Sequence, residues 1–295
     1  MKACSRVDLV IQSEDLSSDA IAAFRVALDA PRPLRKTEAA RLGALDGGPH
    51  DRKIAEALGR YWKCDATFVP VPMPARGMRA LVMDMDSTLV TIEGIDELAR
   101  LAGRGDEVAA ITAAAMRGDI VEYSQSLQQR VALLAGSDAS LVGRVLHERM
   151  RLSPGAEELL QTARAMQWKT LLVSGGFSVF AKPLQAQLGI DEICANELEI
   201  RHDRITGVVT GPATHQGKIV DAAGKARALE TFCRSNGFTP DEAIAVGDGA
   251  NDLAMMAIAG ISVAYRAKPL VQAQAKFALN FTGLDGIPRL FSDTW

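Results

Sequence analysis

The chain has 295 residues, of which 48% are hydrophobic and 23% are charged, a composition typical of a globular protein with about two domains. Its formal net charge of −3 gives no reason to expect nucleic acid or an anionic membrane surface as a partner. No stretch reaches the roughly 18 uninterrupted apolar residues of a membrane span, and the N-terminus lacks the pattern of a signal peptide. We therefore expect a soluble cytoplasmic protein.

The four cysteines are scattered along the chain without a CxxC pair. This spacing argues against a zinc site or a redox motif and fits a reducing compartment. We expect Cys4, Cys64, Cys194 and Cys233 to be buried free thiols.

The N-terminal part of the chain predicts a small α/β domain. Strand-like composition alternates there with apolar side chains at helical spacing, the first helix preceded by serine caps. The predicted elements are strand 7–12, helix 17–29, helix 51–63 and strand 65–72. The following stretch, PVPMPARG (70–77), cannot form a regular helix or a central strand, because proline lacks the donor and restricts its neighbours. We therefore predict one domain at residues 1–75 and a second at 76–295.

The second domain alternates apolar strands with helices, which predicts an α/β fold with a doubly wound, mostly parallel, Rossmann-like sheet. The strand candidates are RALVMDMD (79–86), KTLLVSGG (169–176), EAIAVGDGAND (242–252) and GISVAY (260–265). In the first three, polar residues collect at the C-terminal end of the strand. Because ligands of open α/β sheets bind at that edge, this segregation indicates a functional site.

A long insertion separates the first two of these strands. From residue 93 to about 150 apolar side chains recur at helical spacing, with glycines between the segments, which predicts a helical cap over the sheet edge. Residues 196–211 have the pattern of a β-hairpin with His202 and Asp203 at its tip.

The pair of acids in LVMDMDSTLV (81–90) carries the main chemical signal. On an extended strand Asp84 and Asp86 point to the same face, where repulsion and desolvation oppose their ionisation. A divalent cation would make the pair tolerable, and Mg²⁺ prefers hard oxygen ligands collected in this way. Asp248 and Asp252, in GDGANDLAMM, can face the same crevice and complete the predicted magnesium site.

A carboxylate beside a metal can also attack phosphorus and form an aspartyl phosphate. We therefore predict that Asp84 is the nucleophile. Asp86, with a pKa raised by its neighbour and by burial, would protonate the leaving alcohol and later activate water. We expect the hydroxyl of Thr88 to hold Asp86.

The phosphate group of such a substrate requires donors and a cation. VSGGFS offers the Ser174 hydroxyl and the N–H groups of Gly175 and Gly176 at a predicted helix start. Lys225 is the best candidate for the cation, and Lys218, seven positions earlier, is its competitor.

The four motifs DMDST, SGG, a lysine on a following helix, and GDGANDLAMM occur in this order and resemble those of the haloacid dehalogenase superfamily of phosphatases. The longer set DMDSTLVTIEGIDELARLAG, QSLQQRV, VSGGF, ANELEI, KARAL and AVGDGAND is similar to the phosphoserine phosphatases of that superfamily, over most of residues 79–282. The resemblance implies Mg²⁺-dependent hydrolysis of O-phospho-L-serine, the last step of serine biosynthesis. It also implies that the N-terminal domain is a shortened version of the ACT fold.

The same resemblance implies a role for each matching residue. Asp84 would be phosphorylated and Asp86 would be the general acid and base; phosphate contacts would come from Ser174, Gly175, Lys225 and Asn251. Magnesium would be held by Asp84, the backbone carbonyl of Asp86, Asp248 and Asp252. Glu93 and Arg130 would hold the amino and carboxylate groups of serine, with Met116 and Tyr123 as apolar cap residues. Tyr123 departs from the family, which usually has phenylalanine there.

Two alternatives remain open at this point. One is a related phosphatase or phosphotransferase acting on another small phosphomonoester, and the other is a regulatory amino-acid-binding protein with a vestigial phosphatase core. In each phosphatase case the partner is a small-molecule phosphomonoester. The sequence leaves the oligomeric state open, with a homodimer among the alternatives.

Overall fold

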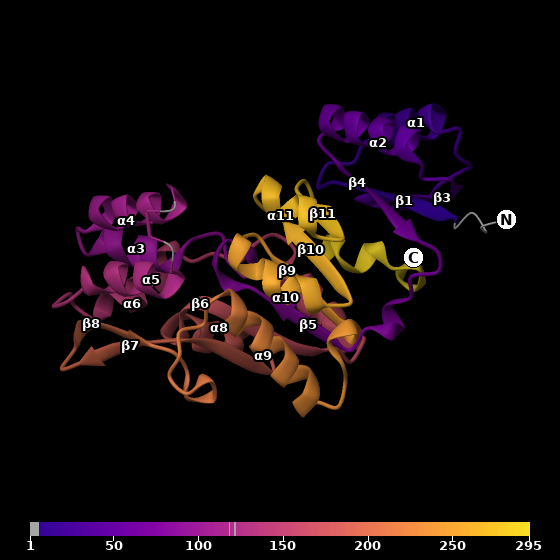
Figure 1. Cartoon of the computed structure of the whole chain (residues 1–295). Coiled ribbons are helices and arrows are strands. Elements are labelled where there is room, and N and C mark those ends of the chain that lie inside the picture. The colour runs from indigo at the N-terminus through magenta and orange to yellow at the C-terminus, as the bar shows by residue number, and fades with distance from the viewer. Residues whose placement is uncertain (1–5, 118, 121) are drawn as a thin grey trace.

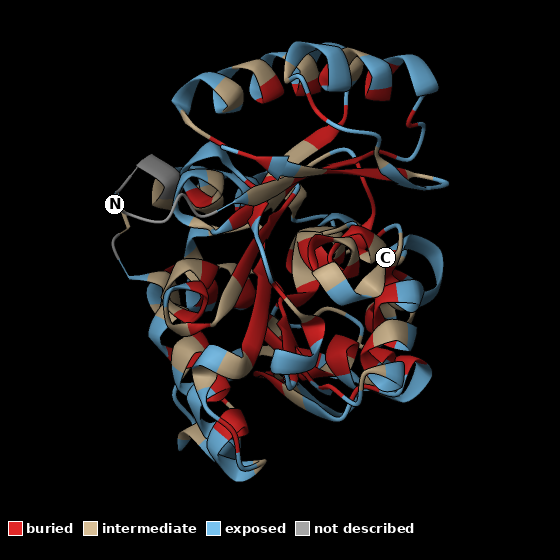
Figure 2. Ribbon diagram, turned by 90° about the vertical axis from the view of Figure 1, so that its right-hand side faces the viewer, coloured by how far each residue is buried: buried red, intermediate tan, exposed pale blue. Residues whose placement is uncertain are grey.

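The computed structural model describes residues 6–117, 119–120 and 122–295. Within these residues the chain forms a four-stranded and a seven-stranded sheet, each with its own helices (Figure 1). Figure 2 shows the central strands as buried, while the outward faces of the covering helices are exposed. The predicted fold class, a mostly parallel α/β sheet beside a smaller unit, is confirmed.

The smaller sheet lies in the N-terminal unit and has the strand order β2-β3-β1-β4, with antiparallel neighbours. Two helices cover one of its faces (Figure 1). The elements are β1 (Val7–Gln12), α1 (Ser18–Ala27), β2 (Leu34–Lys36), β3 (Ala39–Leu45), α2 (Pro49–Trp62) and β4 (Asp65–Pro70). The predicted strands and helices are present, but β2 and β3 were missing from the prediction. β2 is three exposed residues long and β3 is rich in alanine and glycine, which have low strand propensity.

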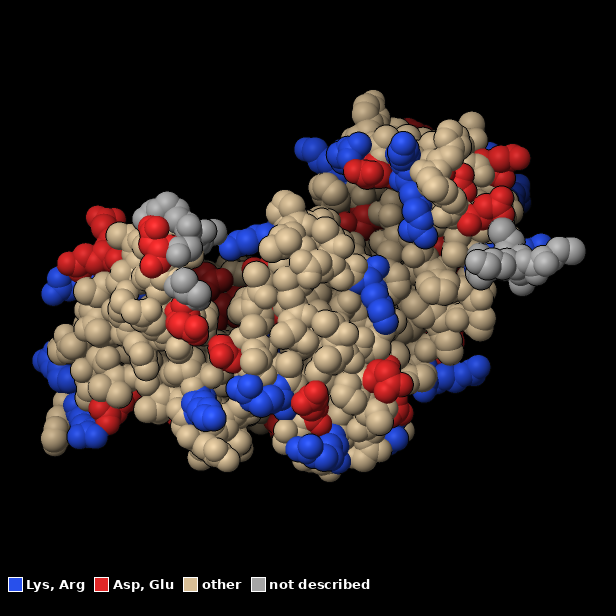
Figure 3. Space-filling model, viewed as in Figure 1, with Lys and Arg blue, Asp and Glu red and all other residues tan. Residues whose placement is uncertain are grey.

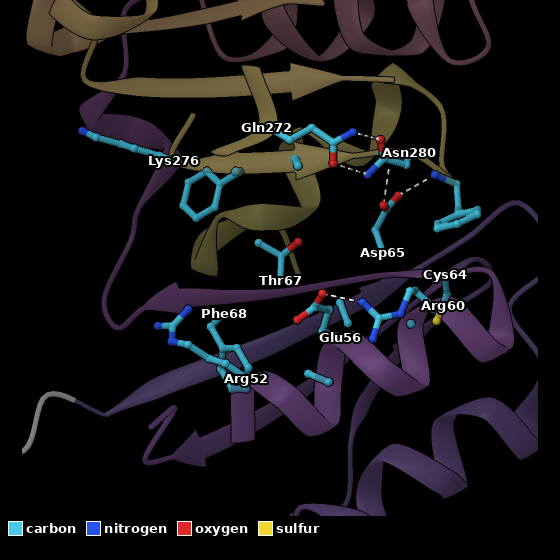
Figure 4. Close-up of a pocket in the computed structure, with 16 residues that line it drawn as sticks. Arg52, Glu56, Arg60, Cys64, Asp65, Thr67, Phe68, Gln272, Lys276 and Asn280 are labelled. Carbon is cyan, nitrogen blue, oxygen red and sulfur yellow. Dashed lines mark hydrogen bonds and ion pairs between the residues drawn. The ribbon is translucent and has the colours of Figure 1, made fainter. Parts of the chain in front are cut away.

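Asp65 joins the N-terminal unit to the larger sheet. Its buried carboxylate accepts hydrogen bonds from the backbone N–H groups of Asn280, Phe281 and Thr282, at 2.7, 2.9 and 3.1 Å. The two edge strands β4 and β11 (Phe277–Leu279) flank a cleft of 510 Å³ next to this contact (Figure 4). Burial raises the pKa of Asp65 to about 6 despite the three donors.

This pKa predicts that Asp65 favours the folded state more in acid, because protonation removes a buried charge. Because the folded-state pKa lies above the ordinary 3.8, the folded protein binds more protons than the unfolded chain between pH 3.8 and 6, and stability from Asp65 is lost as the pH rises through 6. We expect the free energy of unfolding of the wild type, relative to Asp65→Asn, to be about 2–3 kcal/mol higher at pH 4 than at pH 7. Urea denaturation of both proteins at the two pH values measures this, and a pH-independent difference would contradict it.

The larger sheet has the order β11-β10-β9-β5-β6-β7-β8, parallel except for the β7–β8 pair. Its strands are β5 (Ala80–Met83), β6 (Lys169–Phe177), β7 (Glu192–Arg201), β8 (Arg204–Thr210), β9 (Ala243–Gly247), β10 (Ile261–Tyr265) and β11. The predicted hairpin is β7–β8.

The central strand β5 is buried on both faces, as its apolar sequence predicts. Because side chains alternate along a strand, Leu81 and Met83 pack on one side and Ala80 and Val82 on the other. The first pair belongs to a core with α7 (Ala156–Ala165) and α8 (Ser178–Leu188). The second pair belongs to a core with α9 (Ala222–Ser235) and α10 (Leu253–Ile258). A further short helix, α11 (Pro269–Gln274), precedes β11.

The inserted segment forms a helical layer beside the sheet edge (Figure 1). Its helices are α3 (Gly94–Leu101), α4 (Gly105–Arg117), α5 (Tyr123–Ala132) and α6 (Ser140–Arg144), followed by a π-helical turn at Val145–Arg149. The tip of the β7–β8 hairpin supports this layer, because Gly136 and Ala139 donate their N–H groups to the carbonyls of Ile205 and Asp203.

Among the described residues, every helix is too short or too polar to cross a membrane. Cys64, Cys194 and Cys233 are buried free thiols, as predicted, and Cys4 lies outside the described residues.

Candidate active site

The carboxyl ends of the three central parallel strands meet at one point. Strand pairing aligns Met83 of β5 with Leu172 of β6 and Val246 of β9, so the residues that follow are brought together. In this way Asp84, Ser174 and Asp248 reach the same edge of the sheet. Figure 3 shows the surface hollowed between the cap and the rest of the molecule, with acidic side chains lying in the hollow.

Lys225 is the centre of the buried charges at this edge. Its ammonium lies 2.6 Å from Asp84 Oδ1 and 2.7 Å from Asp252 Oδ1, and both Lys225 and Asp252 are 0% exposed. Burial disfavours the charged lysine, but the two carboxylates outweigh it and raise its pKa. Burial and the neighbouring Asp252 hold the pKa of Asp84 well above its ordinary value. Lys218 is exposed, and none of the ion pairs among the described residues includes it, so the geometry favours Lys225.

Three carboxylates form a cluster that can hold a cation. One oxygen from each of Asp84, Asp248 and Asp252 lies within 4.8 Å of the others. Burial and Asp252 raise the pKa of Asp248 to about 6. When all three carboxylates are ionised, the single positive charge of Lys225 leaves an excess of negative charge in a largely buried place. All these oxygens are hard ligands, and the residues therefore fit a divalent metal ion.

Thr88 corrects one expectation from the sequence. Its hydroxyl donates to Asp248 Oδ1 at 3.3 Å, so the prediction that it holds Asp86 is wrong. An irregular turn at Met85–Leu89, in which Asp86 and Ser87 have non-helical backbone angles, follows β5. Within it Thr88 is fully buried and faces Asp248 at the end of β9.

Asp86 has different partners from Asp84. Its Oδ1 accepts the N–H of Gly94 at 2.8 Å, and its Oδ2 accepts the Ser174 hydroxyl at 3.2 Å. Burial, with Glu93 as the next contribution, raises the pKa of Asp86 to about 7. The two acids of the DMDST motif are thus separated in environment, one paired with an ammonium and the other held by neutral donors.

Ser174 and the glycines after it lie at the end of β6, and α8 begins only at Ser178. Gly176 donates its N–H to Ser174 Oγ at 2.8 Å, so this N–H is already engaged. The sequence had predicted both glycine N–H groups at a helix start; the structure instead places the glycines in the strand. The Ser174 hydroxyl donates to Asp86 Oδ2 and would have to turn from Asp86 to bind an anion, and the Gly175 N–H remains a candidate.

Glu93 is exposed at the N-terminus of α3 and contacts the turn that follows β5. The Ser87 hydroxyl donates to Glu93 Oε1 at 2.7 Å. Ser87 has a φ of 57°, a left-handed conformation that is rare for a residue other than glycine and is typical of functional sites. Sequence reasoning missed Ser87 because a backbone conformation leaves no signal in a single sequence.

Three other residues were predicted to belong to the site: Arg130, Asn251 and Met116. Arg130 on α5 is half-buried and donates its Nε–H to Ser126 O at 3.3 Å. Asn251 is half-buried in the 3-10 turn Ala250–Asp252. Met116 lies on α4, but its side chain is outside the part of the chain that the structure describes.

Tyr123 and Asn196 donate hydrogen bonds to the same backbone carbonyl. Tyr123 of the cap donates its hydroxyl to Gly175 O at 3.1 Å, and Asn196 of β7 donates Nδ2 to the same oxygen at 2.8 Å. Asn196 Oδ1 accepts the N–H of Val220, and the asparagine is 0% exposed. Asn196 was not predicted, although a lone amide in the strand segment CANELEI is a signal that could have indicated it.

The sheet with acids at its carboxyl edge is typical of a hydrolase, and comparison with known proteins identifies the family. A model of the haloacid dehalogenase-like hydrolase family matches residues 81–257, so the chain belongs to this family. A phosphoserine phosphatase from Polaromonas sp. is 48% identical over 214 residues, which cover 72% of this chain and 89% of that protein.

Two solved structures extend the comparison. The unliganded form of a probable phosphoserine phosphatase from Vibrio cholerae has a TM-score of 0.80 at 34% identity and covers 97% of this chain and 86% of that one. A phosphoserine phosphatase described as a phospho-aspartyl intermediate analogue has a TM-score of 0.66 at 33% identity and covers 73% of this chain and 99% of that one. The chain is therefore a haloacid dehalogenase-like hydrolase similar to phosphoserine phosphatases.

Proposed function

We propose that this protein hydrolyses O-phospho-L-serine to L-serine and phosphate, the last step of serine biosynthesis. The observation that carries the proposal is the buried contact of Lys225 with Asp84 and Asp252, next to a second acid, Asp86, whose pKa is about 7. The similarity to phosphoserine phosphatases, 48% over most of one relative's length, supports this choice of substrate.

In this proposal Asp84 is the nucleophile. One of its oxygens attacks phosphorus as the bond from phosphorus to the serine oxygen breaks, which leaves an aspartyl phosphate and a serine alcohol. The proton for that alcohol comes from Asp86, and a pKa of about 7 allows this carboxyl group to carry a proton near neutral pH. Asp86 then takes a proton from water, whose oxygen attacks phosphorus and frees Asp84 and phosphate.

Mg²⁺ is the proposed metal, held by Asp84, Asp248, Asp252 and the backbone carbonyl of Asp86. When bound it offsets the negative charge of the phosphoryl oxygens and of the acids. Lys225 contributes a fixed positive charge to the same region, and Ser174, Gly175 and Asn251 are the proposed phosphate contacts.

The substrate's other groups match the remaining predicted residues. Phosphoserine carries an ammonium and a carboxylate, so a selective site requires one acid and one base. We assign Glu93 to the ammonium and Arg130 to the carboxylate, because a guanidinium can bind a carboxylate through two parallel hydrogen bonds. Tyr123 and Met116 are proposed to line the substrate from the cap.

Phosphate release from a panel of phosphomonoesters, with Mg²⁺ and with a chelator, tests the function. We expect phosphoserine to be the best substrate and the chelator to abolish release. A different preferred ester would contradict the proposal, as would transfer of phosphate to added homoserine instead of water. No Mg²⁺-dependent release from any ester would indicate a regulatory protein with a vestigial core.

Arg130 provides a test of substrate recognition. We expect Arg130→Ala to raise KM for phosphoserine by about tenfold to a hundredfold and to change KM for phosphoethanolamine less than threefold, because the latter lacks the carboxylate. Steady-state kinetics with both esters measures the ratio. Arg227→Ala, an exposed arginine on α9, is the matched control. Equal losses for both substrates would refute the assignment.

The wider organisation is part of the same proposal. We assign residues 1–75 to one domain and 76–295 to the phosphatase core, with the cap at about 93–150; the separate apolar cluster of the N-terminal unit supports this division. The buried free thiols support a cytoplasmic location. A homodimer remains a prediction.

A further inference from the structure

The carbonyl oxygen of Gly175 links the cap to the core through hydrogen bonds. It accepts two hydrogen bonds, one from the Tyr123 hydroxyl on cap helix α5 and one from Asn196 Nδ2 on core strand β7. A carbonyl has two lone pairs, so these donors complete its hydrogen bonding. Asn196 is anchored in turn by the Val220 N–H, just before the helix that carries Lys225.

This carbonyl belongs to the segment that holds Asp86. Gly176 donates its N–H to Ser174 Oγ, and the Ser174 hydroxyl donates to Asp86 Oδ2. Fixing the peptide between Gly175 and Gly176 therefore fixes the direction of the Gly176 N–H and, through Ser174, the donor that orients Asp86. Residues 174–176 lie in β6 where its pairing with β7 is irregular, and we call them the phosphate loop.

The approach of Tyr123 is close. A Cβ built on Gly175 would lie 2.2 Å from the Tyr123 hydroxyl oxygen, so this oxygen rests directly against the backbone of the phosphate loop. Burial raises the pKa of Tyr123 to about 12, and the hydroxyl therefore keeps its proton and remains a donor at neutral pH.

We propose that Tyr123 is a positioning residue whose hydroxyl, supplied by the cap, holds the Gly175 carbonyl and so fixes the phosphate loop when the cap lies on the core. Asn196 lies in the core and donates to this oxygen whatever the position of the cap. Tyr123 lies in the cap, so its hydrogen bond depends on the position of the cap. The inference rests on the proposed function, because it assigns the phosphate loop to substrate binding.

Tyr123→Phe tests the role of the hydroxyl, since it retains the ring and leaves Gly175 O with its bond from Asn196. Tyr61→Phe makes the same change at an exposed tyrosine of α2, and is the matched control. We expect Tyr123→Phe to raise KM for phosphoserine about threefold to tenfold with kcat reduced less than twofold, as loss of one neutral hydrogen bond implies. The control should leave both constants unchanged.

Hydrogen exchange provides a readout that is independent of activity. In the protein without substrate we expect the amides of residues 175–177 to exchange about threefold to tenfold faster in Tyr123→Phe than in the wild type, and no change in Tyr61→Phe. Unchanged exchange and unchanged KM, or a fall in thermal stability with KM unaltered, would overturn the proposal. If the wild type fails to hydrolyse phosphoserine, the proposed function fails, and hydrogen exchange still decides whether Tyr123 positions the loop.

Discussion

Asp84→Asn is expected to lower the rate of phosphoserine hydrolysis by at least about a thousandfold, because an amide cannot form the aspartyl phosphate. Phosphate release under saturating substrate and Mg²⁺ measures the effect. The variant should fold normally: Lys225 keeps Asp252 as a partner, and one of three crowded carboxylates is removed.

The matched control is Asp19→Asn, an exposed aspartate on α1 in the N-terminal unit, which should retain full activity. Thermal unfolding of both variants separates loss of chemistry from loss of fold. Activity of Asp84→Asn within tenfold of the wild type would show that Asp84 is not the nucleophile.

Lys225→Met is expected to have the second largest effect. It should lower both the free energy of unfolding and the rate of hydrolysis. Removing the ammonium leaves Asp84 and Asp252 buried without a cation, so the free energy of unfolding of the metal-free protein should fall by about 3–5 kcal/mol. The rate with Mg²⁺ should fall at least about a hundredfold, because a fixed charge next to the reacting phosphate is lost.

Lys218→Met is the matched control, since Lys218 was the other candidate and its side chain is exposed. Urea denaturation in the presence of a chelator gives the stability, and steady-state kinetics gives the rate. If Lys218→Met were the more damaging variant, the assignment of the cation to Lys225 would be wrong.

The arrangement of the active-site edge was predictable from the sequence. Apolar runs that end in acids, in serine with glycines, and again in acids predict parallel strands whose carboxyl ends meet. For this reason Asp84, Ser174 and Asp248 were expected together, and the structure places them together. The sequence ranked Lys225 above Lys218 but left both open, and the structure distinguishes them because it buries Lys225 beside Asp84 and Asp252 and exposes Lys218.

Details that depend on backbone geometry were not predictable. The irregular turn after β5 directs Thr88 to Asp248 and gives Ser87 a left-handed conformation, and neither follows from residue type. The strand β6 continues through the glycines, so Gly176 bonds to Ser174 instead of opening a helix. The β2–β3 hairpin was missed because its residues carry a weak strand signal, and pairing with β1 decides its structure.

Mass spectrometry of protein quenched in acid during turnover of phosphoserine tests the assignment of Asp84 most directly. We expect an acid-stable, base-labile phosphoryl group on the peptide that contains Asp84. This group should be absent from Asp84→Asn and absent when substrate is omitted. Rapid turnover with no phosphoryl group on that peptide at any quench time, together with hydrolysis by Asp84→Asn, would contradict it.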